Sequence, residues 1–405
     1  MKKRELYELL LERFIDTPLV KIIIGIRRSG KSYLLRLLEQ DLLSKGVKQS
    51  NILRMDFESL SIKEYSNYKS LYDYVRNKAE SVSGKIYILI DEIQEVSGWE
   101  KAIRSFLVDL DCDIYLTGSN AHLLSGELAT YLAGRFVEIP LYTLSFLEYM
   151  TFNNIDKNKS GNREEAFLSW LKQGGFPGLY HLPADDEVIR QYILGIYNSV
   201  VLKDVIQRFG IRDSELLERI FLYILDNVGQ LFSGKKIADY LKNQGHKISV
   251  ETVYSHLKAL ENGMIIHSAR RYDIKGKKYL QRLEKYFVAD LGLRYALIGY
   301  RDNDISQLLE NIIYMELRRR GFSVCVGKEG EYEVDFIAEK QDQKVYIQVC
   351  YLLATEEVIE REYHPLKVIK DNHRKIVISM DKIPIGLGDG IEWMNCEDFL
   401  CSGSF

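Results

Sequence analysis

The sequence predicts an α/β protein in which a parallel sheet with a glycine-rich loop is followed by helices and a second, smaller α/β domain. Three observations support this fold class. The apolar run LVKIIIG ends at Gly25 and leads into GIRRSGKS, as expected of a strand buried on both faces. Two further apolar runs, IYILIDE and CDIYLTGSN, also end in polar residues. Near the end of the chain, a helical segment precedes three strand-like runs, a helix and another strand.

The composition is that of an ordered, soluble protein. A chain of 405 residues can form about three domains. Its net charge of −3 argues against a surface that binds nucleic acid everywhere, although a local basic patch is compatible with it. The N-terminus, MKKRELYELLLERF, is typical of an amphipathic helix and not of a signal peptide, and no apolar run reaches the ~20 residues that cross a membrane. The 5 cysteines lack CxxC spacing, which favours reduced thiols in a cytoplasmic protein and no zinc site.

The glycine-rich loop fits the pattern GxxxxGK[ST] and lies between a predicted strand and the helical spacing of YLLRLLEQDLL. Backbone N–H groups of such a loop turn inward on phosphates, the lysine neutralises the β and γ oxygens, and the final hydroxyl ligates magnesium. The alternative is a glycine turn that matches by chance. We expect ATP and Mg²⁺ as ligands, with magnesium at Ser32 and the nucleotide held by Gly25, Arg28, Ser29, Gly30, Lys31 and Ser32.

The run IYILIDE supplies the second part of a nucleotide site. Asp91, at the end of this predicted strand, is expected to join the magnesium shell, and Glu92 to polarise the attacking water. An Asp-Glu pair after an apolar strand often does no more than cap a helix. The combination with the glycine-rich loop is therefore what makes the signal strong.

A third strand and a fourth add candidate catalytic residues. CDIYLTGSN ends beside the other two motifs in a parallel sheet, and we predict that Asn120 senses the γ-phosphate, with Ser119 as the close alternative. In LAGRFVEIPL, Arg135 begins another apolar strand. An arginine that reaches into a neighbouring subunit can contribute about 10³ to 10⁵ in rate. A surface salt bridge is the competing interpretation.

These segments resemble the nucleotide-binding core of an AAA-type ATPase. Farther along the chain, GGFPGLY, SVVLKDVIQRFGIRD, RYDIKGKKYL and YFVADLGLRYAL are similar to the large prokaryotic group in which this ATPase precedes a C-terminal domain of unknown function. The resemblance covers nearly the whole chain. It implies ATP binding, hydrolysis and a cytoplasmic setting, but no particular substrate.

We expect four parts. The polar stretch NNIDKNKSGNREE indicates a boundary after the ATPase domain. The parts are an ATPase domain at residues 1–150, a helical lid or linker at 151–212, a winged-helix domain at 213–300, and a restriction-endonuclease-like domain at 301–405. Within the lid, Arg163 and Arg190 are both candidates for a second sensor arginine, and the sequence does not choose between them.

From Ser214 onward the order helix, helix, helix and two strands is typical of a winged helix, with Ser233 and Ser249 as predicted N-caps. Between Ser268 and Tyr286, basic residues outnumber the two acids; they are Arg270, Arg271, Lys275, Lys277, Lys278, Arg282 and Lys285. Such a strip can contact DNA phosphates without reading sequence. A winged helix that binds protein and leaves this edge solvated is an equal alternative.

The last third resembles the restriction-endonuclease-like fold. In active members, a helix glutamate, a strand aspartate and a following acid bind magnesium, and a lysine two positions later orients water or offsets charge. Glu310 and Asp335 match the first two places, whereas Gln348 occupies the third without a charge. The alternative is that the two acids are solvated or pair with Arg318 and its neighbours.

Cys350 stands where the lysine belongs. A thiol with a pKa near 8.5 is mainly neutral at pH 7, and loss of one preorganised donor typically lowers the rate by about 10² to 10³. We therefore predict an inactive nuclease-like domain. The alternative is rescue by Lys367 or Lys370 from the following helix.

The function predicted from the sequence is magnesium-dependent ATP hydrolysis coupled to rearrangement of domains or of a homo-oligomer. DNA is a candidate partner through the winged helix, and no membrane is involved. One alternative is a nucleotide-gated switch or scaffold with little turnover. The other is a metal-dependent nuclease.

Overall fold

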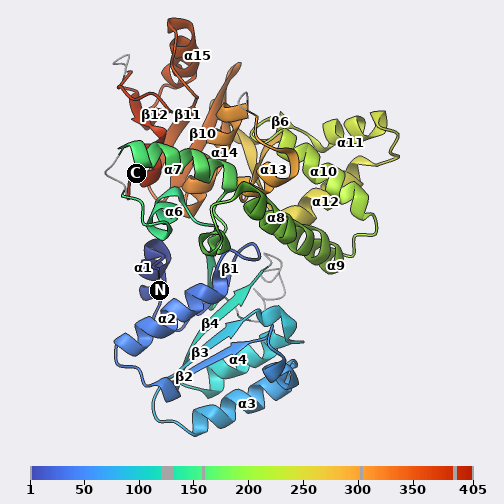
Figure 1. Cartoon of the computed structure of the whole chain (residues 1–405), viewed down its shortest axis with the longest axis vertical. Helices are drawn as coiled ribbons and strands as arrows, with labels where there is room; N and C mark the ends of the chain where they lie inside the picture. Colours follow the sequence, from blue (N-terminus) through green and yellow to red (C-terminus); the bar gives the residue numbers. More distant parts are fainter. Residues whose placement is uncertain are drawn as a thin grey trace. The chain divides into compact units, whose positions relative to one another are not determined.

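The computed structural model describes residues 2–119, 132, 134–156, 160–301, 304–385 and 390–403. The chain divides into two compact units, Met1–Tyr142 with Asn262–Met264, and Thr143–Glu261 with Ile265–Phe405. Each unit is built on its own sheet, one parallel and one mixed (Figure 1). The predicted α/β class is confirmed. Among the helices in the described parts of the chain, none combines the length and apolar character required to span a bilayer.

In its described part, the first unit contains a five-stranded parallel sheet in the order β2-β3-β4-β1-β5. Every residue of β1 and β3 is buried, because helices cover both faces of the sheet. Since the strands are parallel, their carboxyl ends meet at one edge. The strands are β1 Val20–Ile24, β2 Ile52–Asp56, β3 Ile86–Asp91, β4 Cys112–Gly118 and β5 Phe136–Pro140.

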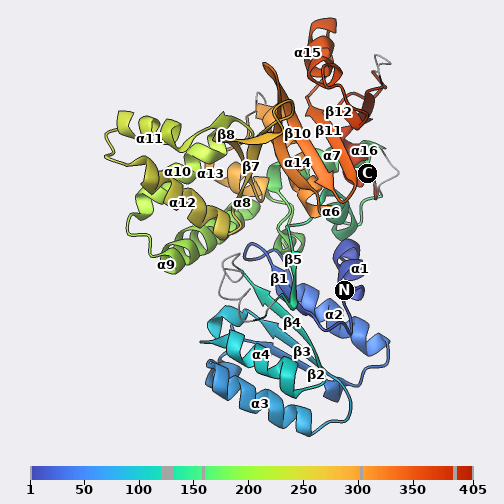
Figure 2. The same cartoon turned by 180° about the vertical axis from the view of Figure 1, so that it is seen from behind.

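Two pairs of helices cover this sheet. Helices α1 (Glu5–Glu12) and α2 (Lys31–Ser44) pack on one face, and α3 (Tyr68–Glu80) and α4 (Trp99–Asp109) pack on the other (Figure 2). Leucines of α2 meet Ile23 and Leu89 of the sheet. Short 3₁₀ turns complete the unit at Gln49–Asn51, Leu60–Tyr65 and Ile93–Glu95.

In the second unit, the described strands form an eight-stranded sheet in the order β13-β12-β11-β10-β9-β7-β8-β6. Strand β7 pairs in parallel with β9, so the hairpin of the predicted wing continues directly into the predicted nuclease-like sheet. One sheet thus runs through the predicted winged-helix and nuclease-like parts, and the three boundaries between the four predicted parts stay predictions. The strands are β6 Leu231–Phe232, β7 Ile266–Asp273, β8 Lys278–Val288, β9 Ser323–Glu329, β10 Tyr332–Lys340, β11 Gln343–Val349, β12 Arg374–Ser379 and β13 Glu392–Asn395.

The helices of the second unit follow the predicted order. Ser233 accepts the N–H of Lys236, and Ser249 accepts that of Thr252, so both predicted N-caps are confirmed. Helix α7 begins at Ser160, within the polar stretch that the sequence suggests as the boundary after the ATPase domain. The helices are α6 Phe146–Phe152, α7 Ser160–Gln173, α8 Asp186–Ile196, α9 Val205–Phe209, α10 Ser214–Asp226, α11 Gly234–Asn243, α12 Val250–Asn262, α13 Leu291–Ile298, α14 Ile305–Arg319, α15 Glu356–Lys367 and α16 Cys396–Cys401, with a 3₁₀ turn at Pro177–His181 and a π-helical turn at Tyr197–Asp204.

The motifs GGFPG and ADLGL meet at the buried carboxylate of Asp290. Its two oxygens accept the N–H groups of Gly175 (2.8 Å) and Gly292 (2.9 Å). Gly174 has φ +78°, and a Cβ there would lie 1.8 Å from Oδ1 of Asp290. Burial raises the pKa of Asp290 to about 6. In this structure both motifs therefore have a packing role.

We predict that the Asp290 carboxyl makes the stability of the protein depend on pH. Its pKa rises from 3.8 to about 6 on folding, so the folded state favours the proton. This stabilisation is complete below the unfolded pKa and is lost as the pH rises through about 6. Relative to Asp290→Asn, the wild type should lose about 3 kcal/mol of unfolding free energy between about pH 4 and 7. Urea unfolding of both proteins across this range measures the difference, with Asp239→Asn as a surface control. A difference that does not change with pH would contradict the assignment.

Candidate functional site

The loop of residues 25–30 lies where the sequence predicts it, between β1 and α2. Gly25 packs so tightly against the chain leaving β5 that a Cβ would lie 2.3 Å from the carbonyl oxygen of Leu141. Gly30 has φ +99° and Arg28 has φ +69°, so the loop turns through two left-handed residues. Helix α2 begins at Lys31, which leaves the N–H groups of its first turn at the loop.

Lys31 joins this loop to the end of β3. Its buried ammonium donates to the carbonyl oxygens of Gly25 (3.1 Å) and Ile26 (3.5 Å). The same nitrogen lies 3.5 Å from a carboxylate oxygen of Glu92. The lysine is therefore held at the carboxyl edge of the sheet by both motifs of the predicted site.

Asp91 is surrounded by hydroxyl groups. The Thr117 hydroxyl donates to Asp91 Oδ1 and accepts the backbone N–H of Glu92 (3.0 Å). Burial raises the pKa of Asp91, while hydrogen bonds from Ser32 and Thr117 oppose the rise. Ser32 and Asp91 are thus neighbours. One hydroxyl and one carboxylate fit Mg²⁺, which takes few protein ligands and fills its other positions with phosphate oxygens and water.

Glu92 adopts a left-handed conformation with φ +53°, which is unfavourable for a residue with a side chain. Its carboxylate accepts hydrogen bonds from Gln94 and from Ser119 (3.2 Å). Ser119, the close alternative for the sensor, therefore contacts the predicted water activator. The first choice, Asn120, lies outside the described residues.

Gln94 is a site residue that the sequence did not indicate. Its Nε2 donates to Glu92, and its Oε1 is buried without a hydrogen-bond partner among the described residues. The motif IYILIDE ends before this position. A polar side chain two residues beyond the acid was the only signal in the sequence.

The arginines proposed from the sequence have different surroundings. Arg135 is exposed just before β5, and its carbonyl oxygen accepts the N–H of Val20 (2.9 Å). Its action on a neighbouring subunit stays a prediction. Arg163 pairs with Glu397 (2.8 Å), and Arg190 donates to the carbonyl oxygen of Ala296 (3.3 Å). Both lid arginines thus have partners within the second unit.

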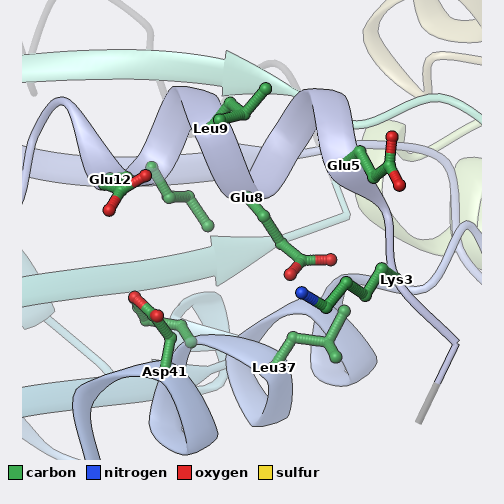
Figure 3. Close-up of a pocket in the computed structure, with 9 residues that line it drawn as sticks. Lys3, Glu5, Glu8, Leu9, Glu12, Leu37 and Asp41 are labelled. Carbon is green, nitrogen blue, oxygen red and sulfur yellow. The ribbon is translucent and has the colours of Figure 1, made fainter. Parts of the chain in front are cut away.

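A separate pocket of about 300 Å³ lies between α1 and α2 (Figure 3). Its acidic rim is partly neutralised, because Glu12 and Asp41 each lie 2.8 Å from the ammonium of Lys45. No residue of the phosphate loop lines it, so it adds nothing to the nucleotide site. The lining residues are Lys3, Glu5, Glu8, Leu9, Leu11, Glu12, Leu37, Leu38 and Asp41.

The predicted nuclease-like acids contact Lys285, a lysine that the sequence analysis assigned to the basic strip of the predicted wing. The ammonium of Lys285, on β8, lies 2.7 Å from Glu310, 2.9 Å from Glu333 and 3.1 Å from Asp335. Its side chain is only 3% exposed. Lys285 therefore does not belong to an exposed basic strip. Glu310 and Asp335 contact Lys285, in place of the solvation or the pairing with Arg318 and its neighbours that was the alternative interpretation.

The side-chain amide of Gln348 is engaged in hydrogen bonds within the protein. Its Oε1 accepts the backbone N–H of Asp335 (2.7 Å), and its Nε2 donates to Glu362 (3.4 Å), another buried acid that the sequence did not indicate. Burial strongly raises the pKa of the Cys350 thiol, which supports its predicted neutrality. Lys367, one proposed substitute, pairs with Glu360 at 3.0 Å.

The surroundings of this cluster also raise the pKa of one of its carboxyl groups. Burial, followed by repulsion from Asp335, raises the pKa of Glu310 to about 8. The neighbouring carboxylates raise the pKa of Lys285 well above its usual value. Among the described residues, no group of three or more His, Cys, Asp or Glu side chains is arranged to hold a metal ion. The ammonium is the cation that these carboxylates contact.

Replacing Lys285 by methionine should destabilise the second unit. Loss of one partner from a buried ion cluster leaves uncompensated carboxylates and typically costs about 3–5 kcal/mol. Denaturant unfolding at pH 7 measures this, with Lys277→Met, at an exposed position, as a control expected within about 0.5 kcal/mol of the wild type. Equal stability of Lys285→Met and the wild type would show that the cluster carries no such energy.

Comparisons with known proteins agree with the fold and the loop geometry. Residues 17–150 match a protein-family model described as an AAA domain. Residues 164–304 match a family described as a domain of unknown function, DUF8612. The class defined by the sheet and the site is thus that of the AAA-type P-loop ATPases, with a C-terminal domain of unknown function.

Two relatives are similar over most of their length. An uncharacterized protein of Haemophilus influenzae is 40% identical over 400 residues, which cover 99% of this chain and 98% of that protein. The uncharacterized protein MJ1544 of Methanocaldococcus jannaschii is 31% identical over 369 residues, covering 87% and 79%. The chain belongs to one family with these two proteins.

Similarity to solved structures is much weaker. The Aeropyrum pernix ORC1 protein in complex with DNA has 14% identity and a TM-score of 0.30, covering 76% of this chain and 94% of that chain. AMPPCP-bound DnaA from Aquifex aeolicus has 17% identity and a TM-score of 0.29, covering 64% and 88%. Scores this low support no conclusion about function.

Proposed function

We propose that the protein binds ATP with magnesium at the loop of residues 25–32 and hydrolyses it. The observation that carries this proposal is the convergence of Lys31, Ser32, Asp91 and Glu92 at the carboxyl edge of one parallel sheet. A phosphate-binding loop, a metal-binding pair and a general base are the three parts that phosphoryl transfer to water needs.

Each of these residues has a chemical role. Lys31 would neutralise the β and γ oxygens, and a phosphate oxygen would replace Glu92 as the partner of its ammonium. Ser32 and Asp91 would hold magnesium, which offsets the charge of the phosphates. Glu92 would then accept a proton from the attacking water. Its contacts with Gln94 and Ser119 orient this carboxylate.

We propose further that turnover rearranges domains or subunits, with Arg135 as the residue offered to a neighbouring copy. The support for this role is its exposure at the start of β5. A nucleotide-gated switch with little turnover is the alternative, and steady-state hydrolysis with and without DNA distinguishes the two. Strong stimulation by DNA favours a remodelling enzyme, whereas a slow rate that ignores DNA favours a switch.

For the nucleic-acid partner, we propose contact through the turn between β7 and β8. Lys275 and Lys277 are exposed in this turn, and Lys278 is exposed at the first position of β8. Such a group of charges attracts phosphates without reading bases. Of the other basic residues in this stretch, Lys285 is buried, and the side chain of Arg282 lies outside the described set.

The proposed ATPase site is tested by two substitutions with opposite effects. Lys31→Ala should weaken ATP binding by about 10- to 100-fold, because a hydrogen bond to a charged group contributes about 1.5–3 kcal/mol. Glu92→Gln should retain binding but lower kcat by about 10² to 10⁴, the usual contribution of a general base. Calorimetry and phosphate release measure the two effects. Glu95→Gln, at an exposed position three residues on, is the matched control. Unimpaired hydrolysis by both variants would refute the assignment.

The proposed DNA contact is tested by neutralising the turn. A Lys275→Gln, Lys277→Gln, Lys278→Gln triple variant should bind duplex DNA more weakly whatever its sequence. Each lost phosphate contact should reduce the slope of log K against log salt by about 0.9. The control removes the same charge from three exposed lysines of the first unit, Lys63, Lys69 and Lys78. If both triple variants bind DNA equally well, the turn is not the contact surface.

A further inference from the structure

Arg4 is a buried cation bound to the phosphate loop. It precedes α1, and the residue is only 1% exposed. Its Nη1 donates to the carbonyl oxygen of Ser29 (3.0 Å), and its Nη2 donates to that of Tyr142 (3.0 Å). The guanidinium also lies 4.7 Å from the centre of the Tyr7 ring. Burial of a charge is unfavourable unless hydrogen bonds compensate it, so these contacts hold the side chain in place.

The contact with Ser29 fixes the direction of the next N–H group. A trans peptide is planar, and its carbonyl oxygen and N–H hydrogen point in opposite directions. The chain contains no cis peptide bond among the described residues. Because the Ser29 oxygen faces Arg4, the N–H of Gly30 faces away from Arg4. Gly30 is one of the residues whose N–H groups such a loop turns onto phosphates.

The contact with Tyr142 involves the residue at which the first unit ends. Both backbone polar groups of Tyr142 are bound by the segment around α1. Its N–H donates to the Tyr7 hydroxyl (3.1 Å), and its carbonyl oxygen accepts from Arg4. The preceding residue, Leu141, donates its N–H to Ile24 (2.6 Å), directly before the phosphate loop. The guanidinium of Arg4 thus connects the phosphate loop to Tyr142, where the chain leaves the first unit.

We propose that Arg4 is a positioning residue of the nucleotide site, which orients the Ser29–Gly30 peptide toward the phosphates and links this peptide to Tyr142. A change in the loop on phosphate binding is then transmitted to the point where the chain leaves the first unit. The inference rests on the proposed ATP binding. It extends that proposal with a residue outside the loop and with a chain of contacts from the loop to Tyr142. Within the N-terminal sequence, Arg4 had no motif to mark it.

The test compares Arg4→Gln with the wild-type full chain, using the nonhydrolysable analogue AMP-PNP with Mg²⁺. Calorimetry should show affinity reduced by about 10-fold or more, the loss typical of a charged hydrogen bond. Arg4→Lys should restore part of it, since the ammonium keeps the charge and can donate to one carbonyl oxygen. Arg13→Gln, an exposed arginine at the end of the same helix, should bind like the wild type.

A second readout separates positioning from a purely structural role. Hydrogen exchange of the Tyr142 amide should slow several-fold in the wild type when AMP-PNP is added at saturation. In Arg4→Gln at saturation, exchange should no longer respond to the analogue. If Arg4 were only structural, the variant would exchange faster both with and without AMP-PNP and would keep its response.

The outcomes distinguish this inference from the proposed function. Wild-type protein that binds no ATP overturns the proposed function and the role of Arg4 together. Wild-type protein that binds, with Arg4→Gln of equal affinity and an intact exchange response, overturns only the role of Arg4. If thermal melting shows that Arg4→Gln is not folded, Arg4→Lys decides the question. Affinity and exchange response equal to those of the wild type would then count against the inference, and reduced values would support it.

Discussion

The first unit depends on one shared hydroxyl at the carboxyl edge of its sheet. Thr117 donates to Asp91 and accepts from the N–H of Glu92, so β4 fixes both the acid that ends β3 and the acid that follows it. This contact needs β3 and β4 in parallel register, as the structure shows them, with β3 buried on both faces. The left-handed conformation of Glu92 is tolerated because its backbone and side chain are both bound. The pairing of β3 with β4 therefore both builds the sheet and positions the two acids of the site.

The sequence predicted those parts of the site that are local. Lys31 and Ser32 are identified by spacing from Gly25, and Asp91 by the apolar run before it, because strand burial and loop geometry act over a few residues. Contacts between distant segments were not predictable. Arg4 and Ser29 are 25 residues apart, and nothing in the amphipathic pattern of α1 distinguishes Arg4 from its neighbours.

In the second unit, too, the sequence did not predict a contact between distant segments. Composition alone makes Lys285 one basic residue in a basic stretch, but its place on β8 puts it among acids from α14 and β10. The prediction that Cys350 removes the nuclease's cation was made from one strand. The structure shows a cation from another strand, bound so closely by the carboxylates that it acts as their internal counter-ion.

The parallel pairing of β7 with β9 has a consequence for cooperativity. Backbone hydrogen bonds across this pair give the three-helix segment and the following α/β segment a common sheet, so neither can melt without exposing an unpaired strand edge of the other. Truncation near residue 300 would leave β7 as such an edge, prone to self-association.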